Sequence, residues 1–309
     1  MITMLSANAP AHIQDMGRYG LRSLGIGHAG AMDVQALRTG NILLRNHENA
    51  AALEVALGGI SLRFERDTPF CITGALYHAE LDGRPVHSYW RHTAQKGQVL
   101  TLLRAVHGMY GYLCVAGGFD VPQVLGSRST DLKAGFGGFA GRAVQAGDCL
   151  PVGEGAPFLP DTGIAPVPFS GCIRLVPSSE YTAFSKHSRS VLLHENWLLR
   201  SDSNRMGYRF DGQPLVLERP LEMLSHAVQA GTVQVPPDGQ PIVLLADAQT
   251  TGGYPKIACV IAADLGRLAQ TRFGARVRFV SADRRDALAA LRKNETYLNQ
   301  IRRIAYADS

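Results

Sequence analysis

The chain has 309 residues with 31 Lys and Arg against 26 Asp and Glu, which gives a net charge of +5, and only 18% of its residues are charged. Its 33 Gly and 16 Pro are too many for a helical bundle and favour short strands joined by tight turns. A hydrophobic content of 46% excludes a disordered chain. The longest apolar run, Ile257–Ala263, is far shorter than the roughly 20 residues of a membrane-spanning helix.

The cations are scattered along the chain, and their densest group, in 284–303, is interleaved with Asp and Glu. This pattern is typical of a solvated helix face, so we expect no nucleic-acid partner. The five Cys are widely spaced and form no CxxC pair, which argues against a zinc ribbon or a thioredoxin-like redox site. The N-terminus lacks a basic segment followed by a long apolar one, so a cytoplasmic location without membrane attachment is expected.

The first half begins with a loosely alternating segment at 2–13, which predicts a strand, followed by glycine-rich loops. A short helix is predicted from Asp33 to Leu44, with Asp33 as a possible N-cap. Strand-like runs then follow, separated by turn dipeptides such as Asp82-Gly83. These runs are Ile60–Phe64, Phe70–Thr73, Ala79–Leu81, Val99–Leu103, Tyr112–Ala116 and Val144–Val152. Such short, closely spaced strands indicate a barrel or a sandwich.

Residues 153–171 contain four Pro and four Gly and form the best linker candidate, which suggests domains at 1–160 and 161–309 with an approximate boundary that terminal segments can cross. Beyond the linker, strands are predicted at Ile173–Val176, Leu215–Glu218, Thr232–Val235, Ile242–Ala246 and Arg276–Phe279. A buried helix is predicted at Ile257–Leu268. The last helix is predicted at 283–305, with an apolar stripe formed by Leu288, Leu291, Leu298 and Ile301.

Several common functional motifs are absent or out of context. Gly25-Ile-Gly27-His-Ala-Gly30 matches the dinucleotide-binding pattern literally, but loop residues precede it, so a glycine-rich turn is the better interpretation. The sequence contains no GxxxxGK[ST] phosphate-binding loop and no GxSxG nucleophile motif. No Lys lies between two Met residues, so covalent biotin attachment is not expected.

The segment from Asp247 to Pro255 is the clearest candidate for a binding loop. It follows a predicted buried strand and offers a carboxylate, an amide, two hydroxyls, two glycines and a phenol within eight positions. A loop that leaves a rigid strand with such groups is well placed to hold a small polar ligand, although a hydrogen-bonded turn would have the same composition. Arg18 and Arg205 are as compatible with structural salt bridges as with ligand contacts, and His226 is better explained as a structural histidine than as a base.

Long motifs make the chain recognisable. They are Gln14-Asp15-x-Gly17-Arg18-x-Gly20, Gly30-Ala-Met-Asp33, Ala116-Gly117-Gly118-Phe-Asp120, Gly126-Ser-Arg-Ser-Thr-Asp131, Ser203-Asn-Arg-Met-Gly-Tyr-Arg209, Gln234-Val-Pro-Pro-Asp-Gly-Gln-Pro241 and Asp247-Ala-Gln-Thr-Thr-Gly-Gly-Tyr-Pro255. With these motifs the chain resembles the 5-oxoprolinase C-subunit family, also called the biotin-dependent carboxyltransferase, allophanate hydrolase subunit 2 or Kip antagonist family, over about residues 10–280. A faint similarity between Asp15–Gly20 and Asn204–Tyr208 agrees with a duplicated architecture.

The resemblance implies a mainly β protein with a few helices and two cyclophilin-like β-barrel domains. It also implies a direct partner, the B subunit of 5-oxoprolinase, and a further partner, the A subunit. Together with this chain they open 5-oxo-L-proline to L-glutamate with ATP as co-substrate. The chain by itself is then expected to be inactive. The ATP site is expected to be shared with a partner, no covalent biotin is expected, and the metal is unknown, with Mg²⁺ possible.

On these motifs we select candidate site residues and expect them to converge on one cleft. The catalytic candidates are Asp15, Arg18, Asn204, Arg205 and Asp247. The substrate-binding candidates are Gln234, Gln249, Thr250, Thr251, Gly252, Gly253 and Tyr254. Two alternatives remain open: a carboxyltransferase component like that of urea carboxylase, and a non-enzymatic regulator that antagonises a kinase-inhibitor partner.

Overall fold

The computed structural model describes residues 1–156 and 158–307. The chain divides into two units that do not follow the linear sequence. Unit 1 consists of Met1–Arg18, Ala29–Phe169 and Glu295–Ser309, and unit 2 consists of Tyr19–His28 and Ser170–Asn294. An N-terminal segment is therefore part of unit 2, and a C-terminal segment is part of unit 1.

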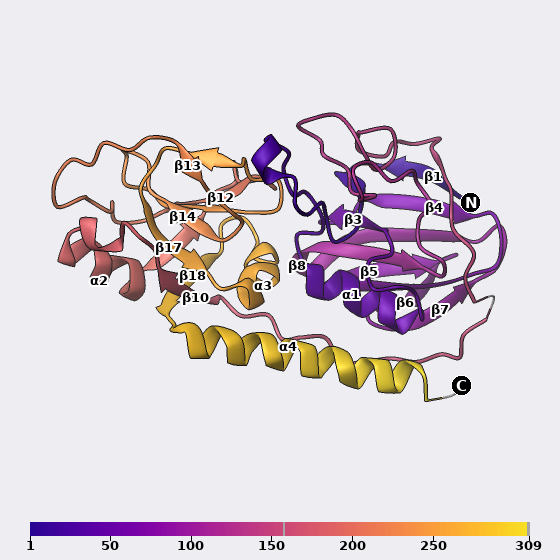
Figure 1. Cartoon of the computed structure of the whole chain (residues 1–309). Helices are drawn as coiled ribbons and strands as arrows, with labels where there is room; N and C mark the ends of the chain where they lie inside the picture. The colour runs from indigo at the N-terminus through magenta and orange to yellow at the C-terminus, as the bar shows by residue number, and fades with distance from the viewer. Residues whose placement is uncertain (157, 308–309) are drawn as a thin grey trace. The chain divides into compact units, whose positions relative to one another are not determined.

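Unit 1 is built around one nine-stranded sheet, drawn in indigo to magenta in Figure 1. Its strands are β1 (Ile2–Ala7), β2 (Ala11–Gln14), β3 (Ala52–Ala56), β4 (Ile60–Phe64), β5 (Thr68–Leu81), β6 (Arg84–Val86), β7 (Arg91–Ala94), β8 (Val99–Val115) and β9 (Cys149–Leu150). The order is β2-β3-β8-β4-β1-β9, and β5 pairs with β6, β7 and β8. The long strand β8 is central because it pairs with β3, β4 and β5.

The predicted helix after the glycine-rich loops is confirmed as α1 (Val34–Leu43). The carboxylate of Asp33 accepts a hydrogen bond from the backbone N–H of Ala36 at 3.1 Å, as an N-cap does. The helix packs on β5 and β8, and Gly40 allows this approach, since a Cβ there would lie 2.5 Å from the Cys114 sulfur.

Four short predicted strands of the first half form parts of two long ones, β5 and β8. Gly74 and Gly108, both at positive φ, interrupt the strand-like pattern of the sequence. In β5 the register shifts between Gly74 and Leu76 while the strand continues. A β-bulge of this kind bends a strand without ending it, which is why the sequence pattern predicted separate elements. Of the predicted strand Val144–Val152, only β9 is a strand.

Unit 2 contains a closed barrel in the order β10-β17-β14-β15-β12-β11-β18. Its strands are β10 (Cys172–Pro177), β11 (Asn196–Leu199), β12 (Gly207–Asp211), β14 (Thr232–Gln234), β15 (Ile242–Leu244), β17 (Lys256–Val260) and β18 (Arg276–Ser281). The parallel pair β10 and β18 closes it. Residues alternate along β18, with Val277 and Phe279 buried in the core and Arg276 and Arg278 exposed, as a strand with one solvated face requires.

A two-stranded ribbon and several short helices complete unit 2. The ribbon pairs β13 (His226–Ala227) with β16 (Thr251–Gly252). The helices are η1 (Arg22–Leu24), η2 (Tyr181–Ala183), α2 (Lys186–His194), η3 (Ala262–Asp264) and α3 (Leu265–Ala269). Helix α2 packs against β18.

Two predictions in the second half are wrong. The predicted helix Ile257–Leu268 is strand β17 followed by η3 and α3, because the apolar run at its start pairs with β10 and β14 inside the barrel. A short apolar run does not distinguish a buried strand from a buried helix. The predicted strand Leu215–Glu218 contributes only an isolated bridge between Leu217 and Phe184.

The last helix is confirmed as α4 (Arg284–Ala305), drawn in yellow in Figure 1. Its buried side chains are Ala290, Leu298, Ile301 and Ala305, so half of the predicted stripe is correct, whereas Leu288 and Leu291 are exposed. In the described residues, no helix is both long and apolar enough to cross a membrane.

The predicted linker is fixed to unit 1 over part of its length. The backbone N–H of Arg91 donates to the carbonyl of Thr162, and that of Ile164 donates to the carbonyl of Tyr89. Gly163 lies against the ring of Trp90, where a Cβ would approach to 2.3 Å. Residues 162–164 are therefore packed on the rest of unit 1 and do not form a free connection.

Candidate functional site

In unit 1, the first group of candidate residues gathers around Asp15. This carboxylate is 2% exposed and accepts hydrogen bonds from both Ser127 and Ser129 hydroxyls at 2.6 Å. It also accepts from the backbone N–H groups of Arg128 at 2.6 Å and Gly17 at 2.8 Å. Three of these donors reach Oδ1 and one reaches Oδ2, so Asp15 holds the loop at Gly126–Asp131 against its own loop.

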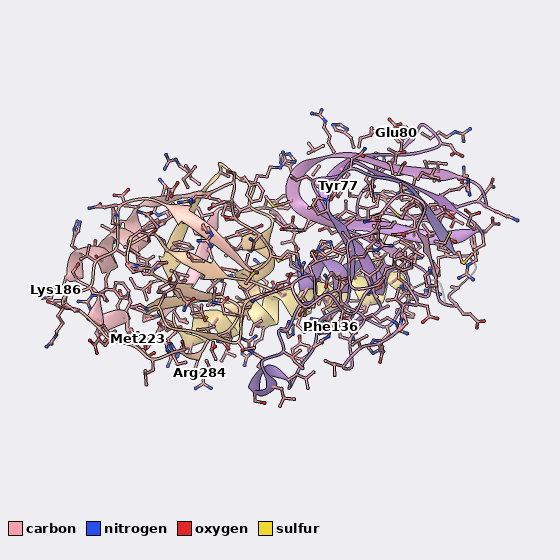
Figure 2. The ribbon with its side chains drawn as sticks, turned by 90° about the horizontal axis from the view of Figure 1, so that it is seen from above. Tyr77, Glu80, Phe136, Lys186, Met223 and Arg284 are labelled. Carbon is pink, nitrogen blue, oxygen red and sulfur yellow. The ribbon has the colours of Figure 1, made fainter. Side chains whose placement is uncertain are left out.

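Arg18 is 1% exposed and is bound to the same loops. Its Nε donates to the carbonyl of Val124 at 3.1 Å, and its Nη2 donates to the carbonyl of Ser129. Its Cζ lies 4.7 Å from the ring centroid of Phe136, which is labelled in Figure 2. A Cβ on Gly137 would collide with this guanidinium, so the glycines of this region serve close packing. These contacts favour a structural role for Arg18.

In unit 2, Arg205 and Asp247 form a bidentate ion pair. Arg205 Nε and Nη2 each donate to one oxygen of Asp247 at 2.8 Å, and both side chains are 8% exposed. The backbone supports this pair, because the N–H of Asp247 donates to the carbonyl of Arg205. The planar fork of an arginine matches a carboxylate in this way, so Asp247 orients its neighbouring Arg.

Asn204 lies beside this pair in sequence but is exposed. Its side-chain oxygen accepts from the backbone N–H of Met206 at 2.9 Å, and its backbone pairs with Gly207. This arrangement is an Asx turn, which explains an asparagine at this position without a ligand.

The candidate binding loop Gln249–Tyr254 follows β15 and includes β16. Gln249 Nε2 donates to Oε1 of the buried Gln234 at 3.5 Å, and Gln234 Nε2 donates to the carbonyl of Tyr254 at 3.4 Å. Both are at the long end of the hydrogen-bond range, so these amides are weakly held. Gly252 lies against the Gln234 amide, whereas Thr251, Gly253 and Tyr254 are exposed.

The ribbon between β13 and β16 supports this loop through the backbone. His226 pairs with Gly252, and the backbone N–H of Val228 donates to the carbonyl of Thr250 at 3.1 Å. The Nδ1 of His226 lies 3.1 Å from the carbonyl of Leu224, while its Nε2 is buried without a hydrogen-bond partner in the described part of the chain. The loop is thus held mainly by backbone hydrogen bonds, and its side chains at Thr251 and Tyr254 are exposed.

The structure thus brings Asp15 and Arg18 together within unit 1, and the remaining candidates within unit 2. Arg205 pairs with Asp247, and Gln234 with the Gln249–Tyr254 loop. The expectation of one shared cleft stays a prediction. Across the described residues, no group of three or more His, Cys, Asp or Glu side chains is arranged to hold a metal ion.

Sequence reasoning missed one residue of this region, Arg22. It lies in η1, in the segment Tyr19–His28 that belongs to unit 2. Its Nη2 donates to the carbonyl of Gln249 at 3.0 Å and also to that of Val228. No local pattern distinguishes it from the other arginines, because its position depends on a contact between residues more than 200 positions apart.

A family model described as carboxyltransferase domain, subdomain A and B, matches residues 24–281. The chain is 57% identical over 304 residues to the C subunit of 5-oxoprolinase from Haemophilus influenzae, covering 98% of both chains. It is 46% identical over 302 residues to the C subunit of 5-oxoprolinase from Escherichia coli, covering 97% of both.

The chain belongs to the 5-oxoprolinase C-subunit family. The predicted family is therefore confirmed, and membership places the chain among enzyme subunits. The fold is also similar to part of the urea amidolyase of K. lactis, with a TM-score of 0.90 and 23% identity. That match covers 97% of this chain and 20% of the urea amidolyase chain, and at this identity it shows the fold alone. The prediction of a mainly β fold is confirmed, but of the two predicted barrels only that of unit 2 is closed among the described residues, since the nine strands of unit 1 form a sheet whose order does not close on itself.

Proposed function

We propose that this chain is the C subunit of an ATP-dependent enzyme that opens 5-oxo-L-proline to L-glutamate, together with the B and A subunits. The similarity to 5-oxoprolinase C subunits over nearly the whole length of both chains carries this proposal. We also infer that both units are of the cyclophilin-like type and that the protein acts in the cytoplasm. The closed barrel of unit 2 supports the first of these inferences.

The reaction needs activation because the lactam amide is stabilised by resonance. In the proposed route the lactam oxygen attacks the γ-phosphorus of ATP, and ADP leaves. Water then adds to the activated carbon, and the C–N bond breaks to leave an acyl phosphate on the opened chain. A second water hydrolyses this acyl phosphate, which releases L-glutamate and phosphate. Hydrogen-bond donors placed where negative charge develops should contribute most to the acceleration of such a step. The weakly held amides of Gln234 and Gln249 and the hydroxyls of Thr250 and Thr251 are suited to bind the lactam.

Arg205 and Asp247 are suited to hold this region in shape rather than to exchange partners. Their two hydrogen bonds match fork to carboxylate, and removing one partner would leave the other charge buried and unpaired. Arg205→Lys should therefore reduce activity, because a lysine lacks the planar fork. We expect the ATP site, with any Mg²⁺ that accompanies the nucleotide, to be shared with the B subunit.

Reconstitution tests the proposal. The purified A, B and C subunits are mixed with ATP and 5-oxo-L-proline, and glutamate and ADP are measured for the full mixture and with each component omitted. We expect release only from the full mixture. Glutamate release by this chain alone, or equal release by the other two components without it, would contradict the proposal.

A carboxyltransferase role is the second candidate, because the fold is shared with part of a urea amidolyase. It predicts transfer of a carboxyl group from a biotinylated carrier to urea or a related amide, which can be followed with labelled bicarbonate. A regulatory role predicts that the chain binds a kinase-inhibitor protein without any turnover. Both assays can be run on the same preparations as the reconstitution.

A further inference from the structure

Arg22 is anchored in unit 2 by one end of its guanidinium. Both contacts of Nη2 are to backbone carbonyls, that of Val228 after β13 and that of Gln249 before β16. An Nη nitrogen carries two hydrogens, so these two carbonyls occupy its donor capacity. The short segment around it is well defined, since Gly25 closes η1 in the left-handed conformation and Tyr19 packs edge-on against His28 at 4.3 Å. The guanidinium is therefore fixed beside the Gln249–Tyr254 loop.

The other end of the guanidinium remains available. Within residues 1–156 and 158–307, Nε and Nη1 of Arg22 make no hydrogen bond to protein, and no carboxylate lies within ion-pair distance. Partial burial lowers the pKa of Arg22 below its usual value, with no acidic neighbour to oppose that effect. Arg205 differs in this respect, because Asp247 neutralises it.

A partly desolvated cation without a counter-ion attracts an anion. With Nη2 occupied, the hydrogens of Nε and Nη1 point to different sides of the guanidinium, and each can donate a charge-assisted hydrogen bond to a carboxylate oxygen. The neighbouring loop supplies amide and hydroxyl groups but no free carboxylate, since Asp247 is already paired. A small molecule with a carboxylate next to an amide would satisfy both the cation and the loop.

We propose that Arg22 binds the carboxylate of a small anionic substrate at the unit 2 site, while its Nη2 holds the backbone of the Gln249–Tyr254 loop. This inference rests on the proposed function, in which 5-oxo-L-proline is that substrate. It assigns the substrate carboxylate to Arg22 and not to Arg18, which is held by backbone carbonyls, or to Arg205, which is held by Asp247.

The test compares an acid with its neutral amide. The reconstituted three-component enzyme, with Arg22→Ala or Arg22→Lys in this chain, is assayed with 5-oxo-L-proline, and its primary carboxamide is tested as substrate and as competitive inhibitor. Loss of a charge-assisted pair should raise KM for the acid by about 10- to 150-fold and leave the carboxamide constants near wild type. Arg22→Lys should be intermediate, and added guanidinium ion should partly restore the alanine variant.

Arg278→Ala is the matched control, because Arg278 is an exposed arginine of unit 2 on β18. It should retain the wild-type constants. Thermal unfolding checks that each variant is folded. If Arg22→Ala is unstable, the comparison of Arg22→Lys with wild type decides the test. An unchanged KM for the acid, or an equal loss for acid and carboxamide, would overturn the proposal. If the wild-type complex releases no glutamate, the proposed function fails and this inference with it.

Discussion

Individual polar residues of the family motifs differ in how firmly the rest of the protein holds them. Asp15 accepts four hydrogen bonds inside unit 1, whereas the amides of the Gln249–Tyr254 loop are weakly held. A motif residue that accepts several buried hydrogen bonds is needed for the stability of the fold, which explains its presence without a ligand. A side chain held by one long contact remains able to bind a ligand.

Asp15→Ala should destabilise the chain strongly, because it leaves several buried donors without an acceptor. We expect a loss of about 3 kcal/mol in the free energy of unfolding, measured by urea denaturation. Asp120→Ala is the control, since Asp120 is 60% exposed and makes one surface ion pair with Arg128, so its loss should be below about 1 kcal/mol. Equal stability of the Asp15 variant and wild type would show that Asp15 is not structural.

Gly252 provides a test of packing at the candidate binding loop. A Cβ at Gly252 would lie 2.6 Å from Nε2 of Gln234, whereas one at Gly253 would meet its nearest atom at 3.5 Å, an ordinary contact. Gly252→Ala should therefore lower the free energy of unfolding by about 1–3 kcal/mol through overpacking, and Gly253→Ala should change it by less than about 1 kcal/mol. Thermal and chemical denaturation measure both. Equal stability of the two variants would mean that the Gln234 amide moves aside and that the predicted overpacking is absent.

At the scale of elements, the end of α4 is held within unit 1 by a network of ion pairs. Arg38 bonds to Glu48 at 2.7 Å and to Glu295 at 2.8 Å, and Arg302 contacts the same two carboxylates. The buried Arg91 adds bonds to the carbonyls of Leu43 and Ala305 at the ends of α1 and α4. Charge and end-capping together fix this segment of α4.

This network predicts acid sensitivity. Hydrogen bonding from Arg38 lowers the pKa of Glu295, and for Glu48 the bonds from Arg302 and Arg38 outweigh burial, so that its pKa is also lowered. A carboxyl with a folded pKa below its unfolded value stabilises the fold above the unfolded pKa, and this stabilisation is lost as the pH falls through the folded pKa. The free energy of unfolding should therefore fall by about 1 kcal/mol below roughly pH 4.5.

The measurement is urea denaturation between neutral pH and about pH 3 for wild type and for the double variant Glu48→Gln, Glu295→Gln. The double variant should be less stable at neutral pH and should lose less stability on acidification. Glu222→Gln is the control, because Glu222 is an exposed acid of unit 2, and it should follow the wild-type curve. Parallel curves for all three proteins would contradict the role of the network.

At the scale of the whole molecule, several large apolar side chains are exposed and the chain has few charged residues. Leu224 is 91% exposed and Leu24 is 72% exposed, and charged residues make up only 18% of the chain. We expect this chain and the B subunit to form a stable complex, for which an interface of about 1,600 Å² is standard. Size-exclusion chromatography of the two mixed proteins at micromolar concentration should give one peak that contains both. Two separate peaks would contradict this expectation.

Local sequence patterns were sufficient for much of the fold. The N-cap at Asp33 and the long helix α4 were predictable because their signals lie within a few residues of each other. The strand-rich class followed from the frequency of Gly and of short apolar runs. The family motifs also identified the loops that carry Asp15 and Gln249. Those motifs could not say which of these residues is structural, because hydrogen-bond partners lie far away in sequence.

Tertiary structure decided the remaining features. The run at Lys256–Val260 is a strand because β10 and β14 pair with it, and the bulged strands β5 and β8 continue through glycines that read as breaks. Asp247 commits Arg205 to an ion pair, and Nη2 of Arg22 reaches Gln249 from a segment far away in the sequence. The sequence alone therefore determined family, class and motif positions, since these depend on local order. Pairing and charge neutralisation depend on contacts that form only when distant segments fold together.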